Sequence, residues 1–139
     1  MNILYTDGSA SPNPGPGGFA VICEGQPVRL GHEPDTTNIR MEGNALIAAL
    51  EYVNGEECVI YTDSEFWINV ITKWSLGWEA NGWKKKGGPI KNLDLVQKAC
   101  ELYRPSNATL TWVRGHDGDE GNELADEWAN NAREQKLTK

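Results

Sequence analysis

The order of apolar and polar positions in the first quarter of the chain predicts three antiparallel strands. Short apolar runs occupy residues 2–6 (NILYT), 18–24 (GFAVICE) and 28–33 (VRLGHE). A stretch rich in glycine and proline, residues 8–18, separates the first two runs and predicts a loop. Runs of this length, divided by turn-forming residues, indicate an antiparallel meander over residues 2–33.

The apolar pattern then changes from short runs to a helical repeat. Leu46, Ala49, Leu50 and Val53 follow the i, i+3, i+4, i+7 spacing, which predicts a helix over residues 41–53. The same spacing predicts further helices at residues 65–76, 93–103 and about 121–135.

Two later apolar runs, residues 58–62 (CVIYT) and 108–113 (ATLTWV), predict two more strands. The helix before residues 58–62 is the crossover that a parallel strand requires, so we expect residues 2–6 and 58–62 to be parallel neighbours. The element order predicts an α/β fold with a mixed five-stranded sheet, three strands antiparallel and the rest parallel, flanked by helices. A chain of 139 residues is expected to form a single domain over residues 1–139.

The tripeptide Tyr-Thr-Asp ends two of these predicted strands, in ILYTDGS and in VIYTDSE. If the two strands are parallel neighbours, Asp7 and Asp63 emerge at one edge of the sheet, where open α/β sheets bind ligands. Glu42 lies on the apolar stripe of its helix, and Asp126 shares a helix face with Asn122. Each acid alone also fits an ordinary turn, cap or surface position, but together they predict a carboxylate cluster.

A cluster of carboxylates requires an explanation because like charges repel. At roughly 5 Å and an effective dielectric constant near ~20, each pair costs about 3 kcal/mol. A fold retains such a cluster when a cation neutralises it or when one acid stays protonated. Oxygen ligands suit Mg²⁺ or Mn²⁺, and no histidine or cysteine has the spacing of a zinc site. Two such cations suit in-line displacement at phosphorus.

The net charge and its distribution along the chain indicate which kinds of partner the protein can bind. The formal net charge is −7, which by itself disfavours a nucleic-acid partner. Residues 73–91, however, contain five lysines and one acid, interleaved with tryptophans. No apolar run is long enough to span a bilayer and no leader is visible, so we expect no membrane partner. The three separated cysteines predict buried free thiols in a reducing, cytoplasmic location.

Five motifs, read in order, resemble those of type 1 ribonuclease H. They are YTDGSASPNPGPGGFA, TNIRMEGNAL, IYTDS, the Trp/Lys segment and WVRGHDGDEGNELAD, and they extend from Leu4 to about Ala132. The resemblance implies a ribonuclease H-like fold and an endonuclease that hydrolyses the RNA strand of RNA/DNA hybrids. It implies two-metal-ion cleavage with Mg²⁺, for which Mn²⁺ is a substitute, leaving 3′-hydroxyl and 5′-phosphate ends. We expect the protein to be a monomer.

The resemblance also implies roles for single residues. The metal-binding catalytic acids would be Asp7, Glu42, Asp63 and Asp126. His116 would assist proton transfer or product release, while Asn122 would support the neighbouring acid. The substrate-binding residues would be Asn13, Thr37 and Asn38, together with Trp83, Lys84, Lys85 and Lys86. The last four lie in the segment from Trp74 to Lys91, which resembles the basic protrusion of the family. Trp74 and Trp78 fit positions in the hydrophobic core as well as they fit substrate contacts.

Two positions depart from the family pattern. Glu65 stands where the family usually has glutamine, and Ile39 replaces a common polar residue in the substrate loop. An added negative charge at Glu65 would weaken binding of a phosphate backbone, so these departures bear on affinity more than on chemistry. Two alternatives remain: a related duplex-DNA nuclease of the resolvase or transposase type, and a non-catalytic module that binds hybrids.

Overall fold

A computed structural model describes residues 2–115 and 119–139 of the chain. In this part of the chain, five strands form one sheet. The strands are β1 (Asn2–Ala10), β2 (Gly15–Cys23), β3 (Gln26–Thr36), β4 (Cys58–Thr62) and β5 (Ala108–Trp112). The α-helices are α1 (Asn38–Val53), α2 (Glu65–Asn69), α3 (Ser75–Ala80), α4 (Leu93–Tyr103) and α5 (Glu120–Gln135). A π-helical turn, η1 (Val70–Trp74), joins α2 to α3.

The strand order β3-β2-β1-β4-β5 confirms the predicted mixed five-stranded sheet. β1, β2 and β3 pair antiparallel, whereas β1–β4 and β4–β5 pair parallel. The expected parallel pair runs from Asn2 opposite Cys58 to Tyr5 opposite Tyr61. Asp7 and Asp63 each lie two residues beyond the last paired residues, Tyr5 and Tyr61.

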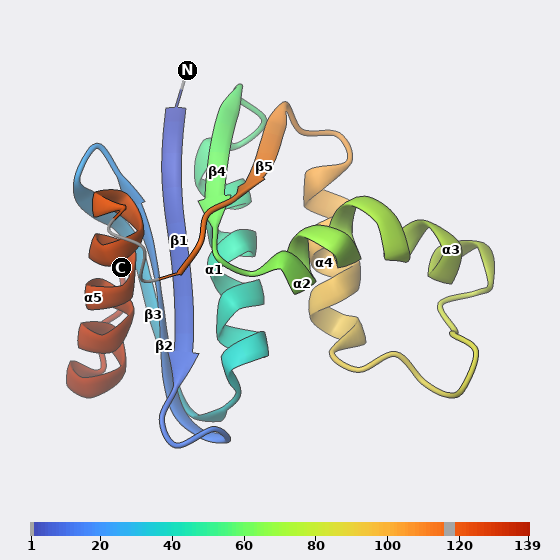
Figure 1. Ribbon diagram of the computed structural model, residues 1–139, viewed down its shortest axis with the longest axis horizontal. Helices are drawn as coiled ribbons and strands as arrows, with labels where there is room; N and C mark the ends of the chain where they lie inside the picture. Colours follow the sequence, from blue (N-terminus) through green and yellow to red (C-terminus); the bar gives the residue numbers. More distant parts are fainter. Residues whose placement is uncertain (1, 116–118) are drawn as a thin grey trace.

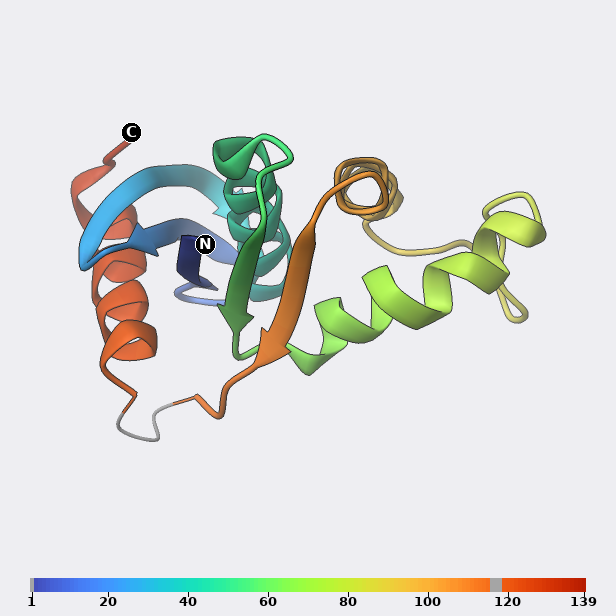
Figure 2. The ribbon, with the colours of Figure 1, turned by 90° about the horizontal axis from the view of Figure 1, so that it is seen from above.

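Helices cover both faces of the sheet, which gives three layers (Figures 1 and 2). α1 and α4 enclose the larger core on one face, which includes Leu4, Leu46 and Ile60, all fully buried. α5 covers β1, β2 and β3 on the other face through a small alanine-rich core. Small side chains there let the helix lie close to the sheet, because a larger side chain would separate the two backbones.

The hairpin of β1 and β2 is longer than the sequence predicts, which corrects the expected loop at residues 8–18. β1 continues to Ala10 and β2 begins at Gly15, so only residues 11–14 form the turn. Glycine is disfavoured in strands by propensity, but here tertiary packing requires it. A Cβ atom on Gly8 would lie 2.3 Å from the backbone of Met41 in α1, and one on Gly18 would lie 2.4 Å from the backbone of Ala129 in α5. These glycines allow helices to approach the sheet from both sides.

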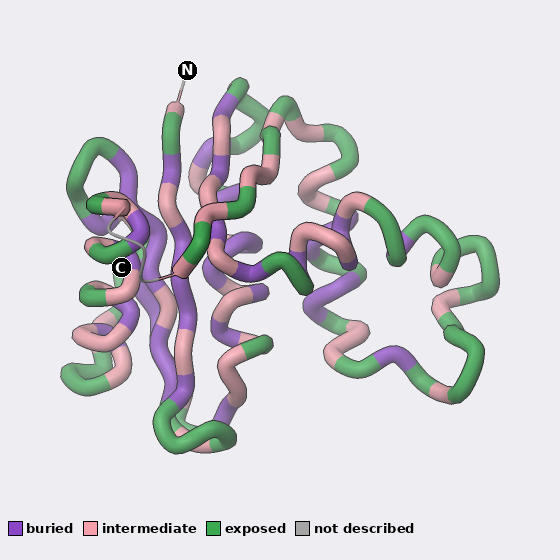
Figure 3. The backbone as a smooth tube through the Cα atoms, in the orientation of Figure 1, coloured by how far each residue is buried: buried purple, intermediate pink, exposed green. Residues whose placement is uncertain are grey.

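The helical segment after β4 projects away from the body of the molecule. The sequence predicts one helix over residues 65–76, and the chain is helical from Glu65 to Ala80 with the π-turn in its middle. Residues 81–92 then return to the start of α4 without regular structure, and most residues of this protrusion are exposed (Figure 3). We call residues 74–91 the basic protrusion.

Two further features of the structure concern the cysteines and membrane-spanning helices. Cys23, Cys58 and Cys100 are buried free thiols, as expected. In residues 2–115 and 119–139, no helix is long and apolar enough to cross a membrane.

Candidate active site

Asp7 lies in the middle of β1, at the position where its neighbour β4 ends. The sequence places Asp7 just after the strand, but the β1–β2 hairpin extends past it, with Asp7 opposite Ala20. β4 pairs with β1 only as far as Tyr61, so the sheet is open beside Asp7 on that side. Asp7 and Asp63 are therefore close together at the point of the sheet where β4 ends, although only Asp63 follows the end of its strand.

Asp7 is a buried carboxyl group surrounded by other acids. Its residue is 8% exposed, and its Oδ1 accepts a hydrogen bond from the Gly8 amide at 2.9 Å. Desolvation, followed by the negative charge of Asp63, raises the pKa of Asp7 to about 9, and Asp126 adds to the increase. A buried acid with such neighbours holds a proton at neutral pH or requires a cation.

Glu42 reaches the same cluster from the first turns of α1. Thr37 caps this helix, since its hydroxyl accepts from the Arg40 amide at 3.1 Å. Burial raises the pKa of Glu42 to about 7, a hydrogen bond from Ser64 opposes the increase, and the charge of Asp63 adds to it. The prediction that Glu42 faces inward is thus matched by the desolvation of its carboxyl group.

Asp63 connects the end of β4 to the end of β5. Its backbone carbonyl accepts a hydrogen bond from the Trp112 indole at 3.3 Å. Gly115 also lies close to Asp63, because a Cβ atom on it would be 3.0 Å from the Asp63 carboxylate. Since Asp63 also acts on the pKa of both Asp7 and Glu42, it is the electrostatic centre of the cluster.

Asp126 comes from α5, on the other face of the sheet. Asp119 caps this helix by accepting from the Asn122 amide at 3.0 Å. Asn122 is 3% exposed, and its side-chain oxygen has no hydrogen-bond partner among the described residues. A buried, unpaired oxygen beside an acid cluster fits an additional group, such as a water held by a cation.

The donor set fits a hard divalent cation. All four acids supply oxygen, the ligand that Mg²⁺ prefers, and the pKa values of Asp7 and Glu42 are raised first by burial and then by the neighbouring acids. In the described part of the chain, no three His, Cys, Asp or Glu side chains form a ready-made cage around a metal position. The charges of Asp63 and Asp126 act on the pKa of Asp7, and the charge of Asp63 acts on that of Glu42, so the four acids form one electrostatically linked group.

Three of the predicted substrate-binding residues gather at the start of α1. Asn13, in the hairpin turn, accepts a hydrogen bond from the Asn38 amide at 3.1 Å. Asn38 in turn accepts from the Ala10 amide at 2.6 Å, and Thr37 forms the helix cap beside it. These bonds join the turn between β1 and β2 to the helix that carries Glu42, so the turn and the acid cluster hold a fixed relative position.

The basic protrusion presents its lysines to solvent. Lys84, Lys85 and Lys86 are exposed, whereas Trp83 is half-buried and packs against the larger core. Trp78 also packs against that core, but Trp74 is 45% exposed. The core alternative therefore holds for Trp78 and not for Trp74, and Trp83 is partly exposed.

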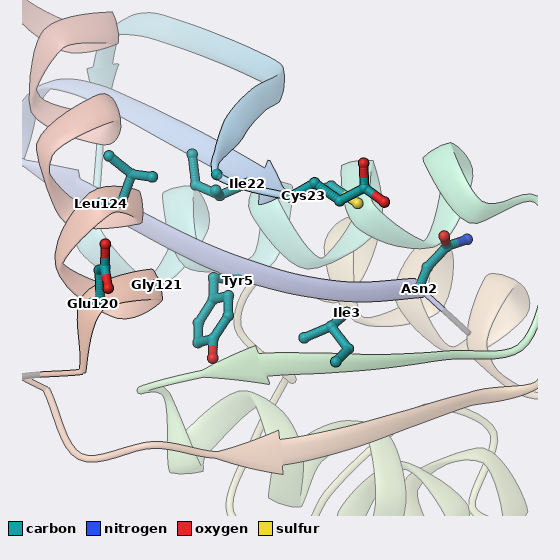
Figure 4. Close-up of a pocket in the computed structure, with 10 residues that line it drawn as sticks. Asn2, Ile3, Tyr5, Ile22, Cys23, Glu120, Gly121 and Leu124 are labelled. Atoms are coloured by element: carbon teal, nitrogen blue, oxygen red, sulfur yellow. The ribbon is translucent and has the colours of Figure 1, made fainter.

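Trp112 and the contact of Ser64 with Glu42 were not predicted from the sequence. A signal for Trp112 existed, because it lies near the end of the strand predicted over residues 108–113. His116 lies outside the described residues. A cavity of about 540 Å³ between β1 and the start of α5 is lined by none of the four acids (Figure 4). The acid cluster is therefore separate from this cavity.

Comparison with known structures agrees with this arrangement of the sheet and helices. The crystal structure of LC9-RNase H1, a type 1 RNase H with the type 2 active-site motif, superposes with a TM-score of 0.82 at 28% identity, covering 99% of this chain and 75% of that one. LC11-RNase H1 in complex with an RNA/DNA hybrid superposes with a TM-score of 0.68 at 25% identity, covering 99% and 100%. The fold is therefore the ribonuclease H-like α/β fold.

Sequence comparison identifies the family. The RNase H family model matches residues 1–134. The ribonuclease H of Gluconobacter oxydans (strain 621H) is 43% identical over 138 residues, covering 95% of this chain and 91% of that protein. The ribonuclease H of Maricaulis maris (strain MCS10) is 47% identical over 134 residues, covering 91% and 89%. The chain belongs to the RNase H family and is an enzyme of that family.

Proposed function

We propose that this protein is an endonuclease that hydrolyses the RNA strand of RNA/DNA hybrids, leaving 3′-hydroxyl and 5′-phosphate ends. The observation that carries the proposal is the acid cluster, in which Asp63 acts electrostatically on both Asp7 and Glu42. A module that only bound hybrids would gain nothing from negative charge gathered beside phosphates. A family member bound to an RNA/DNA hybrid supports the same substrate.

Asp7, Glu42, Asp63 and Asp126 would hold two Mg²⁺ ions, for which Mn²⁺ is a substitute. When bound, these ions supply an activated water for in-line attack and stabilise the departing 3′-oxygen. The protein's own contribution is positional. α1 carries Glu42, α5 carries Asp126, and the sheet carries the two aspartates, so three layers of the fold converge on one phosphate.

The remaining residues would bind and orient the hybrid. Asn13 and Asn38, joined by a hydrogen bond, would contact the duplex near the cleaved strand, with Thr37 beside them. The exposed lysines at 84–86 would pair with phosphates of the DNA strand, and Trp83 would contact its sugars or bases. His116 would assist proton transfer or product release. RNA would be selected through the 2′-hydroxyl of the strand at the acids.

The proposal includes one domain over residues 1–139, acting as a monomer in the cytoplasm. A related nuclease that cleaves duplex DNA is the rival enzyme. Matched RNA/DNA, RNA/RNA and DNA/DNA duplexes, incubated with and without Mg²⁺, separate the possibilities. We expect Mg²⁺-dependent cleavage of the RNA strand of the RNA/DNA duplex alone. Cleavage of DNA/DNA would support the rival, and hybrid binding without turnover would support the non-catalytic module.

A further inference from the structure

Gly121, in the first turn of α5, lies against the ring of Tyr5 in β1 (Figure 4). A Cβ atom on Gly121 would lie 2.4 Å from Cε2 of Tyr5 and 2.5 Å from its Cδ2 and Cζ. Side-chain atoms do not approach one another so closely, so a residue without a side chain is required there for the helix to start this near the strand. Gly121 is also the one glycine in the sequence of α5.

The ring of Tyr5 is held at its place on the sheet. It stacks on the ring of Tyr61 in β4, with the ring centroids 4.9 Å apart and the planes inclined by 17°. The parallel register places these two residues directly opposite each other. Because displacing the ring would break this stacking, the first turn of α5 rests on a surface whose position is set by β1 and β4.

A cavity adjoins this contact. The volume of about 540 Å³ between β1 and the start of α5 is lined by Tyr5 and Gly121, and by apolar side chains that include Ile3, Ile22 and Leu124. Packing between the sheet and the helix start is therefore incomplete beside the ring. The neighbouring side chains would not replace the support that the ring gives to Gly121.

A second close approach lies on the other side of Asp126. A Cβ atom on Gly18, in β2, would lie 2.4 Å from the carbonyl oxygen of Ala129 in α5. Asp126 thus lies between two points, Gly121 and Ala129, at which the helix touches the sheet closely. Since a helix is stiff over so short a length, these two contacts determine how far the backbone of Asp126 lies from the sheet.

This separation matters because Asp126 meets an acid on the sheet. The side chain of Asp126 hydrogen-bonds to the carboxyl group of Asp7. Alternate residues of a strand point to the same face, so Asp7 and Tyr5 lie on the same face of β1. The strand that carries Asp7 therefore also carries the ring on which the helix of Asp126 rests.

We propose that Tyr5 is a positioning residue for metal binding, because its contact with Gly121 sets the height of α5 at which Asp126 and Asp7 can share metal ions. The ring acts through the helix and not by chemistry of its own, so its hydroxyl group is dispensable. The inference rests on the proposed function, in which Asp7 and Asp126 are metal ligands. It adds a residue that decides whether those two ligands meet.

Titration of Mn²⁺ into the hybrid-free protein, followed by the electron paramagnetic resonance signal of free Mn²⁺, tests the inference without cleavage. Gly121→Ala forces the helix away from the ring, and Tyr5→Val removes the ring while keeping a good strand former. Each should weaken Mn²⁺ binding roughly 10- to 100-fold, the usual loss when the support of a metal ligand is removed. Tyr5→Phe retains the ring and should bind Mn²⁺ as the wild type does. Gln135→Ala, an exposed change at the far end of α5, is the control and should do the same.

A double variant separates the contact from independent effects of the two residues. In the Tyr5→Val protein the methyl group of an alanine at position 121 has space, so adding Gly121→Ala should cause no further loss of Mn²⁺ affinity. In cleavage assays the two single variants should need more Mg²⁺ for half-maximal rate. Their KM for the hybrid at saturating Mg²⁺ should stay at the wild-type value, because neither change touches the residues that bind the duplex.

Several outcomes would overturn the positioning role alone. One is a wild-type Mn²⁺ affinity in Gly121→Ala, and another is an equal loss from Gly121→Ala with and without the Tyr5 ring. A lower thermal midpoint at unchanged Mn²⁺ affinity would assign the contact to general stability instead. If Gly121→Ala does not fold, equal Mn²⁺ affinities of Tyr5→Val and Tyr5→Phe would refute the inference. A wild type that binds Mn²⁺ but cleaves no hybrid would remove the proposed function, and the Mn²⁺ titrations would still decide the role of Tyr5.

Discussion

Asn13 in the hairpin turn and Asn38 at the start of α1 are joined by a hydrogen bond of 3.1 Å between the Asn13 side-chain oxygen and the Asn38 amide. The Asn38 side chain continues the chain of bonds to the Ala10 amide at 2.6 Å. Two residues expected to contact the same substrate therefore also fix each other's position. A substitution of either one should be felt at the other.

The first prediction concerns this pair. Asn13→Ala and Asn38→Ala should each raise KM about tenfold, because each loses a polar contact and loosens its partner, an effect of about 1.4 kcal/mol. The double variant should raise KM by less than the product of the two single effects. Steady-state kinetics of the three variants provide the measurement. Fully multiplicative effects would show that the two residues act independently.

Asp63→Asn should lower kcat by roughly 10³-fold or more, since the amide retains the shape but loses the charge that holds a cation. The fold should remain intact, because the amide also relieves repulsion with Asp7 and Glu42. Glu101→Gln, an exposed acid on α4, is the control and should behave as the wild type. Substantial Mg²⁺-dependent cleavage by the Asp63→Asn variant would contradict the assignment.

The pKa of Asp7 predicts how the stability of the metal-free protein depends on pH. The value is raised from 3.8 to about 9, so the folded state binds more protons than the unfolded state between these limits. The free energy of unfolding should therefore be highest below about pH 4 for this group and should decrease as pH rises towards 9. Asp7→Asn should show a flatter dependence, with the contribution of Glu42 remaining only between about pH 4.5 and pH 7. Denaturant titrations at several pH values, with chelator present, test this, and identical slopes for both proteins would refute it.

Replacement of Lys84, Lys85 and Lys86 by alanine should weaken hybrid binding without affecting the chemistry. KM should rise, and the slope of log affinity against log salt should fall by roughly 2 to 3, because fewer counterions are released. The rate at saturating hybrid should change little. A matched variant with Lys98, Lys136 and Lys139 replaced, all exposed outside the protrusion, should retain the wild-type slope. A large loss of kcat at unchanged KM would mean that the protrusion serves a different role.

Glu65→Gln should bind the hybrid more tightly than the wild type. Glu65 is exposed at the start of α2, close to Asp63 in sequence and bordering a shallow hollow that Trp112 also lines. Its charge repels nearby phosphates, so the gain should be largest at low salt, where screening is weakest. Glu101→Gln removes the same charge elsewhere and serves as the control. Unchanged affinity would remove Glu65 from the substrate surface, and an increased Mg²⁺ requirement would place it near the metal ions.

Local sequence patterns determined the elements of this protein. The apolar run at residues 58–62 and the helical repeat at residues 93–103 match the observed β4 and α4, because burial of one strand or one helix face leaves a periodic record in the sequence. The repeated Tyr-Thr-Asp and the place of Glu42 on the apolar stripe of its helix likewise predict that these acids lie close together, as the electrostatic effect of Asp63 on both Asp7 and Glu42 indicates. Parallel pairing of β1 with β4 followed from the intervening helix.

Only the tertiary structure decided how far β1 extends and what surrounds the acids. Gly8 was predicted in a loop, yet it belongs to a strand because α1 packs too closely for any side chain there, and α5 packs equally closely against Gly18. The raised pKa of Asp7 depends on burial and on charges contributed by other elements, and the placement of Trp112 beside Asp63 depends on the register of β4 with β5. Such properties arise from contacts between residues far apart in the chain, and no local pattern of apolar and polar positions specifies the distance between them.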